Sequence, residues 1–210
     1  IIEAHEGQYR KSGEPYCVHP ILVASITAHF SKDEAVIATA LLHDVVEDTE
    51  YPLDYIAEKW GTDIAHMVDG LTKIVEIRET EFVTADGASD SKIMSSALTF
   101  RKMLIASIDD ARVLIVKLCD RLHNMLTLQV LPANKQRRIT EETLVVYVPI
   151  ANRLSISALK NALEDLAFFY IYPEEYKKID DFLKEQQNAM QLTFNNFIST
   201  TKKLLEKNGY

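Results

Sequence analysis

The sequence is poor in the residues that make turns. Six glycines and six prolines are 12 of its 210 residues, about half of the roughly 12% that they contribute to an average protein. A β-sandwich or a β-barrel needs many tight turns, and these depend on glycine and proline. Their scarcity argues against both architectures and favours long helices. We therefore predict an all-α fold.

Cysteines and long apolar runs are scarce as well. The two cysteines, Cys17 and Cys119, stand 102 residues apart among apolar neighbours. This arrangement is typical of reduced thiols in a cytosolic protein rather than of a disulfide framework. No stretch approaches the roughly 18 unbroken apolar residues of a membrane span, and residues 1–10 lack the order of a signal peptide. We expect a cytoplasmic protein with no membrane partner.

The net charge of −8 is unevenly distributed. Residues 1–100 carry 7 basic and 18 acidic side chains, residues 101–160 carry 10 and 5, and the remainder carry 6 and 8. The overall acidity argues against binding of DNA or RNA. An acidic segment together with a basic segment suits a metal ion beside a small anionic substrate.

Apolar periodicity, capping residues and helix breakers predict helices over most of the chain. The predicted helices are 20–30, 32–48, 53–60, 63–77, 90–107, 111–131, one that begins near residue 135 and bends at Pro149, 159–172 and 174–207, with a surface loop at 79–91. We place one domain at residues 1–180. Residues 181–210 lose strong periodicity and are interpreted as a connector or peripheral helix.

His43 and Asp44 stand side by side within the apolar stretch 32–48. Buried charge is costly unless it is paired or binds a metal. On a continuous helix, Glu47 lies four residues after His43 and Asp48 four after Asp44, so one face carries a histidine and three carboxylates. Such a cluster repels itself without a cation, and the helix dipole adds to the cost at this end. The alternative is a solvated acidic helix end.

Two further residues could complete a metal site. His19 lies at a helix start and Asp120 lies in the middle of an apolar helix. Taken singly, His19 is an ordinary core or surface histidine, and Asp120 is a partner for Arg121. Taken with His43 and Asp44, they form two imidazoles and two carboxylates, a set that suits Mn²⁺, Fe²⁺ or Zn²⁺. Such a metal lowers the pKa of its bound water and polarises a phosphoryl oxygen.

The order His, His-Asp, Asp is that of the HD-domain phosphohydrolases, and several stretches resemble one branch of them. The stretches are residues 4–16, which contain RKSGEPY, then 18–20, then 40–49, which contain HDVVEDT, and 116–124, which contain KLCDRLHN. They are similar to the hydrolase domain of RelA/SpoT-type alarmone enzymes, over about residues 4–180. Residues 147–154 and 163–168 resemble the stretch that joins hydrolase to synthetase in long bifunctional members.

The resemblance implies an HD-domain helical bundle around a divalent metal site. It implies Mn²⁺-dependent hydrolysis of the 3′-pyrophosphate of ppGpp or pppGpp to GDP or GTP plus pyrophosphate, with synthetase and regulatory domains in the same longer chain. By this resemblance the metal ligands are His19, His43, Asp44 and Asp120; the catalytic residues are Glu47 and Asp48; and the substrate-binding residues are Arg10, Lys11, Asn124 and Thr127. Tyr147 and Arg153 are further candidates for the substrate pocket.

The chemistry of the residues agrees with several of these roles. The planar guanidinium of Arg10 can stack on a purine, whereas Lys11 acts as a point charge. Asn124 lies four residues after Asp120 on one helix face, so we expect both in one pocket. The alternative for Arg10 and Lys11 is a solvated basic pair. The basic residues at 135–138 either attract the pyrophosphates or form an ordinary surface charge run.

Two other functions stay open. One is an HD phosphohydrolase for another nucleotide, such as a dNTP, which would leave residues 10–13 without a role. The other is a non-catalytic alarmone-binding module, and intact Glu47 and Asp48 argue against it. Because every member of the site is present, we expect active hydrolysis. Residues 75–91 look longer than usual for the family, so family expectations about regulation do not extend to them.

Overall fold

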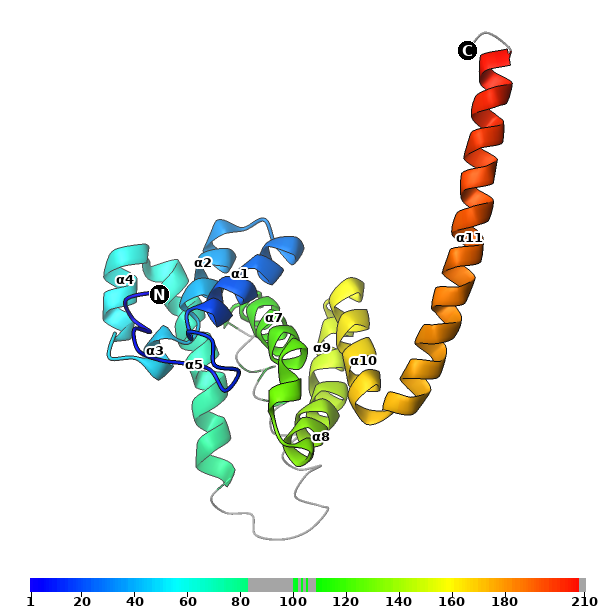
Figure 1. Ribbon diagram of the computed structural model, residues 1–210. Coiled ribbons are helices and arrows are strands. Elements are labelled where there is room, and N and C mark those ends of the chain that lie inside the picture. Colours follow the sequence, from blue (N-terminus) through cyan, green and yellow to red (C-terminus); the bar gives the residue numbers. More distant parts are fainter. Residues whose placement is uncertain (83–99, 102, 104, 106–108, 208–210) are drawn as a thin grey trace. The chain divides into compact units, whose positions relative to one another are not determined.

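A computed structural model gives the fold (Figure 1) and describes residues 1–82, 100, 101, 103, 105 and 109–207. Over these residues it is helical and contains no β-sheet, which confirms the predicted all-α fold. The elements are α1 (Val18–Phe30), α2 (Glu34–Leu42), α3 (Val45–Asp48), α4 (Leu53–Trp60), α5 (Thr62–Phe82), α7 (Arg112–Leu126), η1 (Leu128–Val130), α8 (Ala133–Glu142), η2 (Thr143–Tyr147), α9 (Val148–Arg153), α10 (Ser157–Ile171) and α11 (Pro173–Lys207). No helix in the described part of the chain is long and apolar enough to cross a membrane.

The chain divides into two compact units, residues 1–167 and 168–210. In the first unit, α2 packs against α1, α5 and α7, and α1 and α5 also pack against α7 (Figure 1). Val36 and Ala40 of α2 are fully buried there, in agreement with a stretch that is apolar almost all round. In the second unit, α11 forms one long helix. The domain boundary at residue 180 and the connector role of residues 181–210 stay predictions.

The predicted helix 32–48 is interrupted at residues 43 and 44. Helix α2 begins after Asp33, whose carboxylate accepts a hydrogen bond from the Ala35 amide at 2.9 Å, and it ends at Leu42. Helix α3 begins at Val45, so His43 and Asp44 lie at the turn between two helices. The prediction of one continuous helix was wrong because no glycine or proline marks this break. The break separates the His-Asp pair from the carboxylates of α3.

Other helix boundaries also differ from the predictions. Helix α7 ends at Leu126 and a short 3₁₀ turn follows it, whereas the sequence predicted a helix to residue 131. The helix predicted to begin near residue 135 is present as α8, the π-helical turn η2 and α9. Pro149 lies in the first turn of α9, where its missing N–H is tolerated, and the bend at Pro149 stays a prediction. Helix α5 continues to Phe82. Three other predictions fall mostly outside the described residues: the surface loop 79–91, the unusual length of segment 75–91, and the helix 90–107.

Arg112 forms ion pairs with acidic residues at the N-terminal ends of three helices. Its guanidinium lies 3.1 Å from Asp33 before α2, 2.6 Å from Asp63 in α5, and 2.7 Å from Asp110 before α7. These hydrogen bonds from Arg112 lower the pKa of both Asp33 and Asp110. A network of this kind contributes more than an isolated surface pair, although solvent still screens it.

We expect Arg112→Met to lower the Tm at pH 7 by roughly 2–4 °C, the shift that a small stability loss causes in a domain of this size. Carboxylates whose folded pKa is lowered stabilise the fold above their ordinary pKa and lose this effect as the pH falls through the lowered value. Calorimetry at pH 7, 5 and 3.5 should therefore show the same Tm difference between the wild type and Arg112→Met at pH 7 and at pH 5. The Tm difference should be smaller at pH 3.5. Arg137→Met, which removes one exposed pair with Glu141, is the control, and an equal loss of Tm in it would contradict the prediction.

Candidate functional site

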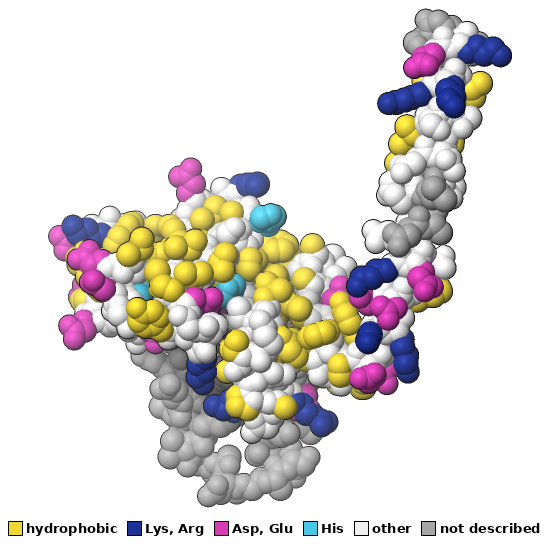
Figure 2. Space-filling model, in the orientation of Figure 1, with side chains coloured by type: hydrophobic (Ala, Val, Ile, Leu, Met, Phe, Trp, Pro, Cys, Tyr) yellow, Lys and Arg dark blue, Asp and Glu magenta, His cyan; other side chains and the backbone are white. Residues whose placement is uncertain are grey.

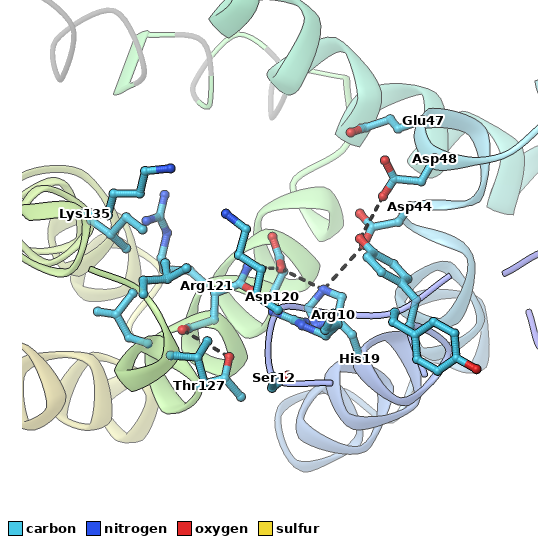
Figure 3. Close-up of a pocket in the computed structure, with 18 of the residues that line it drawn as sticks. Arg10, Ser12, His19, Asp44, Glu47, Asp48, Asp120, Arg121, Thr127 and Lys135 are labelled. Carbon is cyan, nitrogen blue, oxygen red and sulfur yellow. Dashed lines mark hydrogen bonds and ion pairs between the residues drawn. The ribbon is translucent and has the colours of Figure 1, made fainter. Parts of the chain in front are cut away.

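A pocket of about 950 Å³ lies in the first unit (Figure 3). Its walls come from the segment before α1, from α1, from the α2–α3 turn and α3, and from α7, η1, α8 and η2. Most of the predicted site residues line it: Arg10, Lys11, His19, Asp44, Glu47, Asp48, Asp120, Asn124, Thr127 and Tyr147. His43 is fully buried behind the lining. Arg153 is exposed and does not line the pocket.

The four predicted metal ligands meet at one wall of this pocket. His19 Nε2 lies 3.3 Å from Asp120 Oδ1 and 3.5 Å from Asp44 Oδ2. His43 Nε2 lies 3.1 Å from Asp44 Oδ2 and 3.9 Å from Asp120 Oδ1. One ligand atom from each of His19, His43 and Asp120 lies within 4.8 Å of the others. Three separate elements therefore direct imidazole nitrogens and carboxylate oxygens at one point, as a divalent cation requires.

His43 is in the tautomer that a metal ligand needs. Its Nδ1 lies 2.8 Å from the Ala40 carbonyl oxygen, which can only accept, so Nδ1 carries the hydrogen. Its Nε2 then presents a lone pair toward the cluster, and this buried atom has no hydrogen-bond partner among the described residues. A buried nitrogen without a partner is costly in a folded protein. The donor set thus fits a divalent metal.

The charges at this wall also favour a cation. Burial alone would raise the pKa of Asp120, but Lys117 and the two imidazoles outweigh burial and hold that pKa well below its usual value. Burial opposes protonation of His43, but Asp44 and Asp120 outweigh it and raise its pKa. The carboxylates at this wall therefore favour positive charge beside them. A divalent cation that binds to deprotonated ligands here would supply such charge.

The remaining oxygen of Asp120 has its own partner. Asp120 Oδ2 lies 3.2 Å from the Lys117 ammonium one turn earlier on α7, while its Oδ1 accepts a 2.6 Å hydrogen bond from Asn124. Asn124 therefore shares the pocket with Asp120, as their spacing predicted. Arg121 instead pairs with Glu142 at 3.0 Å. The alternative in which Arg121 neutralises Asp120 is wrong.

Glu47 and Asp48 stand beside the metal ligands on α3. Burial is the main cause that raises the pKa of Glu47 to about 7. Asp48 is exposed, and the Tyr16 hydroxyl lies 2.8 Å from its Oδ2 and 2.8 Å from Asp44 Oδ2. The single hydroxyl hydrogen of Tyr16 is thus shared between the two carboxylates, and burial together with these charges raises its own pKa. Tyr16 fixes the spacing between the metal wall and α3.

Arg10 reaches the pocket from a tight turn. The Arg10 amide donates to the Glu14 carbonyl at 2.9 Å, and Gly13 in this turn has φ +90°, a conformation that other residues rarely adopt. The Arg10 side chain donates to Asn124 Oδ1 at 2.9 Å. Its other terminal nitrogen, Nη1, is buried and has no partner among the described residues. Arg10 therefore keeps a donor free for a ligand.

A basic end of the pocket faces the acidic one. Lys135 and Arg138 line it from one face of α8, whereas Arg137 does not. In Figure 3, Lys135 lies on the opposite side of the pocket from Asp44, Glu47 and Asp48. Figure 2 shows acidic side chains gathered at the α3–α4 end of this face and basic side chains nearer α8. The pocket therefore has two poles of opposite charge.

The structure adds residues that sequence reasoning missed. Tyr16, Lys117 and His123 contact the predicted metal ligands, and all three lie inside the quoted RKSGEPY and KLCDRLHN stretches. His5 is also buried and packs against the Tyr16 ring at 4.7 Å. Tyr147 is 3% exposed and lies beneath the Arg121 guanidinium, 3.8 Å from it, so it offers little of its ring to a ligand. The sequence signal that could have indicated Tyr16, Lys117 and His123 is their position within these two motifs.

Comparison with known proteins agrees with this geometry. Residues 1–157 match the family described as HD domain. The chain belongs to the HD-domain family. The resemblance to RelA/SpoT-type enzymes is confirmed by curated relatives of this HD-domain chain. This HD-domain chain is 41% identical over 207 residues to a guanosine-3′,5′-bis(diphosphate) 3′-pyrophosphohydrolase of Borreliella burgdorferi. The match covers 99% of this chain and 30% of the relative.

Other relatives carry related names. A protein named GTP pyrophosphokinase from Myxococcus xanthus is 45% identical over 195 residues, with 91% of this HD-domain chain and 25% of the relative covered. The bifunctional (p)ppGpp synthase/hydrolase SpoT of Escherichia coli is 38% identical over 207 residues, with 99% and 28% covered. The chain thus spans between a quarter and a third of the length of these relatives.

A solved structure shares the fold. It is the structure of a metazoan ortholog of SpoT that is described as hydrolysing ppGpp. It matches with a TM-score of 0.59 and 24% identity, and the match covers 79% of this chain and 88% of that one. At this identity the match supports the HD-domain fold alone.

Proposed function

We propose that this HD domain hydrolyses the 3′-pyrophosphate of ppGpp or pppGpp and releases GDP or GTP together with pyrophosphate. The observation that carries the proposal is the two-ended pocket. One end holds the His/Asp cluster with Glu47 and Asp48, and the other holds Lys135 and Arg138. A nucleotide with phosphate groups on both sides of its ribose matches these two ends. The names of the curated relatives support the same substrate.

In this proposal His19, His43, Asp44 and Asp120 hold Mn²⁺. When bound, the metal lowers the pKa of water and polarises a phosphoryl oxygen. Glu47 is the general base, because it is half-buried, lines the pocket, and has a pKa near neutrality. Asp48, held by the Tyr16 hydroxyl, orients the attacking water.

The other predicted residues bind the nucleotide. Arg10 stacks on the guanine base, with Lys11 beside it as a point charge. Asn124 and Thr127 line the same pocket and bind the ribose and phosphates in this proposal. Tyr147 lines the same pocket and supports the Arg121 guanidinium with its ring. Synthetase and regulatory domains in the same longer chain stay a prediction, as does a cytoplasmic location.

The test is release of pyrophosphate from ppGpp by the 210-residue protein, with Mn²⁺ added or removed by a chelator. We expect release with Mn²⁺, its loss after chelation, and its return when Mn²⁺ is restored. A panel of dNTPs in the same assay distinguishes the broader phosphohydrolase. Tight ppGpp binding without turnover in saturating Mn²⁺ would instead identify a binding module.

Arg138 offers a test of the basic end of the pocket. A charged hydrogen bond to a phosphate contributes about 1.5–3 kcal/mol, so we expect Arg138→Gln to raise the KM for ppGpp roughly tenfold or more. The increase in KM should be smaller for an analogue of ppGpp that carries one phosphate instead of two on its 5′ side. The 5′ side of this analogue is shorter and extends less far toward Arg138 on α8. Both KM values come from the pyrophosphate assay.

Arg137→Gln is the matched control. It removes the same charge from the adjacent position, but Arg137 is outside the pocket lining and pairs with Glu141 at 2.9 Å. Equal increases of KM in the two variants would show that only the general charge of α8 matters, and that Arg138 does not contact the substrate.

A further inference from the structure

His123 lies directly behind one of the proposed metal ligands. Its Nδ1 is 2.8 Å from His19 Nδ1, the two ring centroids are 4.8 Å apart, and each residue is 3% exposed. Two imidazole nitrogens at this distance share one hydrogen, so one ring donates and the other accepts. Unlike the adjacent Asn124, His123 does not line the pocket. Its influence on the site therefore passes through His19.

The surroundings of the other ring nitrogen of His19, Nε2, decide which histidine donates this hydrogen bond. His19 Nε2 faces Asp120 at 3.3 Å and Asp44 at 3.5 Å, where the metal ligands converge. A metal-binding Nε2 must present a lone pair, which places the hydrogen of a neutral ring on Nδ1. His19 Nδ1 then donates, and His123 Nδ1 accepts.

We propose that His123 is a positioning residue for the metal site. Its Nδ1 is the acceptor that holds His19 in the tautomer and orientation that metal binding requires. This inference rests on the proposed metal site and adds to it a residue that contacts neither the metal nor the substrate.

The second histidine of the site shows the same arrangement with a different acceptor. His43 Nδ1 donates to the carbonyl oxygen of Ala40, three residues earlier in α2. His19 is the second residue of α1 and instead reaches across to α7, which also supplies Asp120. The pair therefore fixes α1 and α7 at the spacing that lets His19 and Asp120 share a metal.

The test compares Mn²⁺ affinity among variants of the 210-residue protein, measured from the electron paramagnetic resonance signal of free Mn²⁺. His123→Leu removes the acceptor and should weaken Mn²⁺ binding about 10–100-fold, the usual effect of losing such a partner. His123→Asn keeps an acceptor oxygen close to the Nδ1 position and should restore most of the affinity. Met125→Ala removes a fully buried side chain from the same helix and should leave the affinity unchanged.

A second measurement reads the tautomer itself. In protein labelled with ¹⁵N-histidine and loaded with diamagnetic Zn²⁺, His19 Nδ1 should show the chemical shift of a protonated nitrogen in the wild type and in His123→Asn. Equal Mn²⁺ affinity in the wild type and His123→Leu would overturn the inference. Equally weak binding by His123→Asn and His123→Leu would also overturn it, because the acceptor would then not matter. A wild type that binds neither metal refutes the proposed metal site itself, which is a distinguishable result.

Discussion

Glu47→Gln is expected to lower the rate of pyrophosphate release from ppGpp by about 10²–10⁴-fold, the range that a positioned general base contributes. Glutamine keeps the size and polarity of the side chain but cannot take a proton. Because Glu47 is not one of the four proposed metal ligands, Mn²⁺ affinity should change far less than the rate. Single-turnover release of pyrophosphate in saturating Mn²⁺ measures the effect.

The same substitution should not weaken the fold. Burial raises the pKa of Glu47 to about 7, which means that the folded protein disfavours its ionised form. Above that pH the wild type holds a carboxylate whose burial costs stability, whereas glutamine is neutral at every pH. We therefore expect the metal-free variant to have a Tm at pH 8 at least as high as that of the wild type. A lower Tm would indicate that misfolding contributes to the loss of rate.

The pH dependence of the rate follows with a definite sign. A general base must be ionised, so kcat/KM should rise with pH through the pKa of Glu47 and level off above it. A bound divalent cation lowers that pKa, so the midpoint should lie at or below pH 7 in saturating Mn²⁺. The residual activity of Glu47→Gln should lack this step. A step with the same midpoint in both proteins would assign it to another group.

Most of the helices could be predicted from the sequence because periodicity, capping residues and helix breakers involve residues close together in the chain. The apolar periodicity of α2 and α7, and the scarcity of glycine, are visible without tertiary information. Asn124 was placed beside Asp120 from a spacing of four residues, and the 2.6 Å hydrogen bond between them confirms it. These predictions succeed because a helix fixes which residues share a face.

The geometry of the site depended on contacts that the sequence does not encode locally. The break at His43 and Asp44 lies in an apolar run without glycine or proline, so nothing nearby marks it. The hydrogen bond between His19 and His123 joins residues 104 positions apart. Tyr16 likewise reaches Asp44 across 28 positions. Such partners are set by how α1, α2 and α7 pack, which no periodicity in one helix shows.

Asp44→Asn should strongly weaken Mn²⁺ binding and abolish hydrolysis. The substitution keeps the shape of the side chain but removes the charge at Oδ2, the atom that lies 3.1 Å from His43 Nε2 and 3.5 Å from His19 Nε2. Losing a direct ligand should cost more than the 10–100-fold in affinity that an outer partner costs. We expect Mn²⁺ affinity to fall by more than about 100-fold and pyrophosphate release to become undetectable.

Comparing Mn²⁺ affinity and turnover among three variants distinguishes the role of Asp44 from the roles of nearby residues. Tyr16→Phe removes the hydroxyl between Asp44 and Asp48 and leaves the ligand in place, so it should lower the rate by a smaller factor. Asp54→Asn, which changes an exposed carboxylate of α4, should alter neither quantity. Unchanged Mn²⁺ affinity and turnover in Asp44→Asn would refute the assignment of the metal site. Loss of turnover with intact Mn²⁺ affinity would instead move Asp44 from metal binding to the chemistry of the attacking water, because its carboxylate shares the Tyr16 hydroxyl with Asp48.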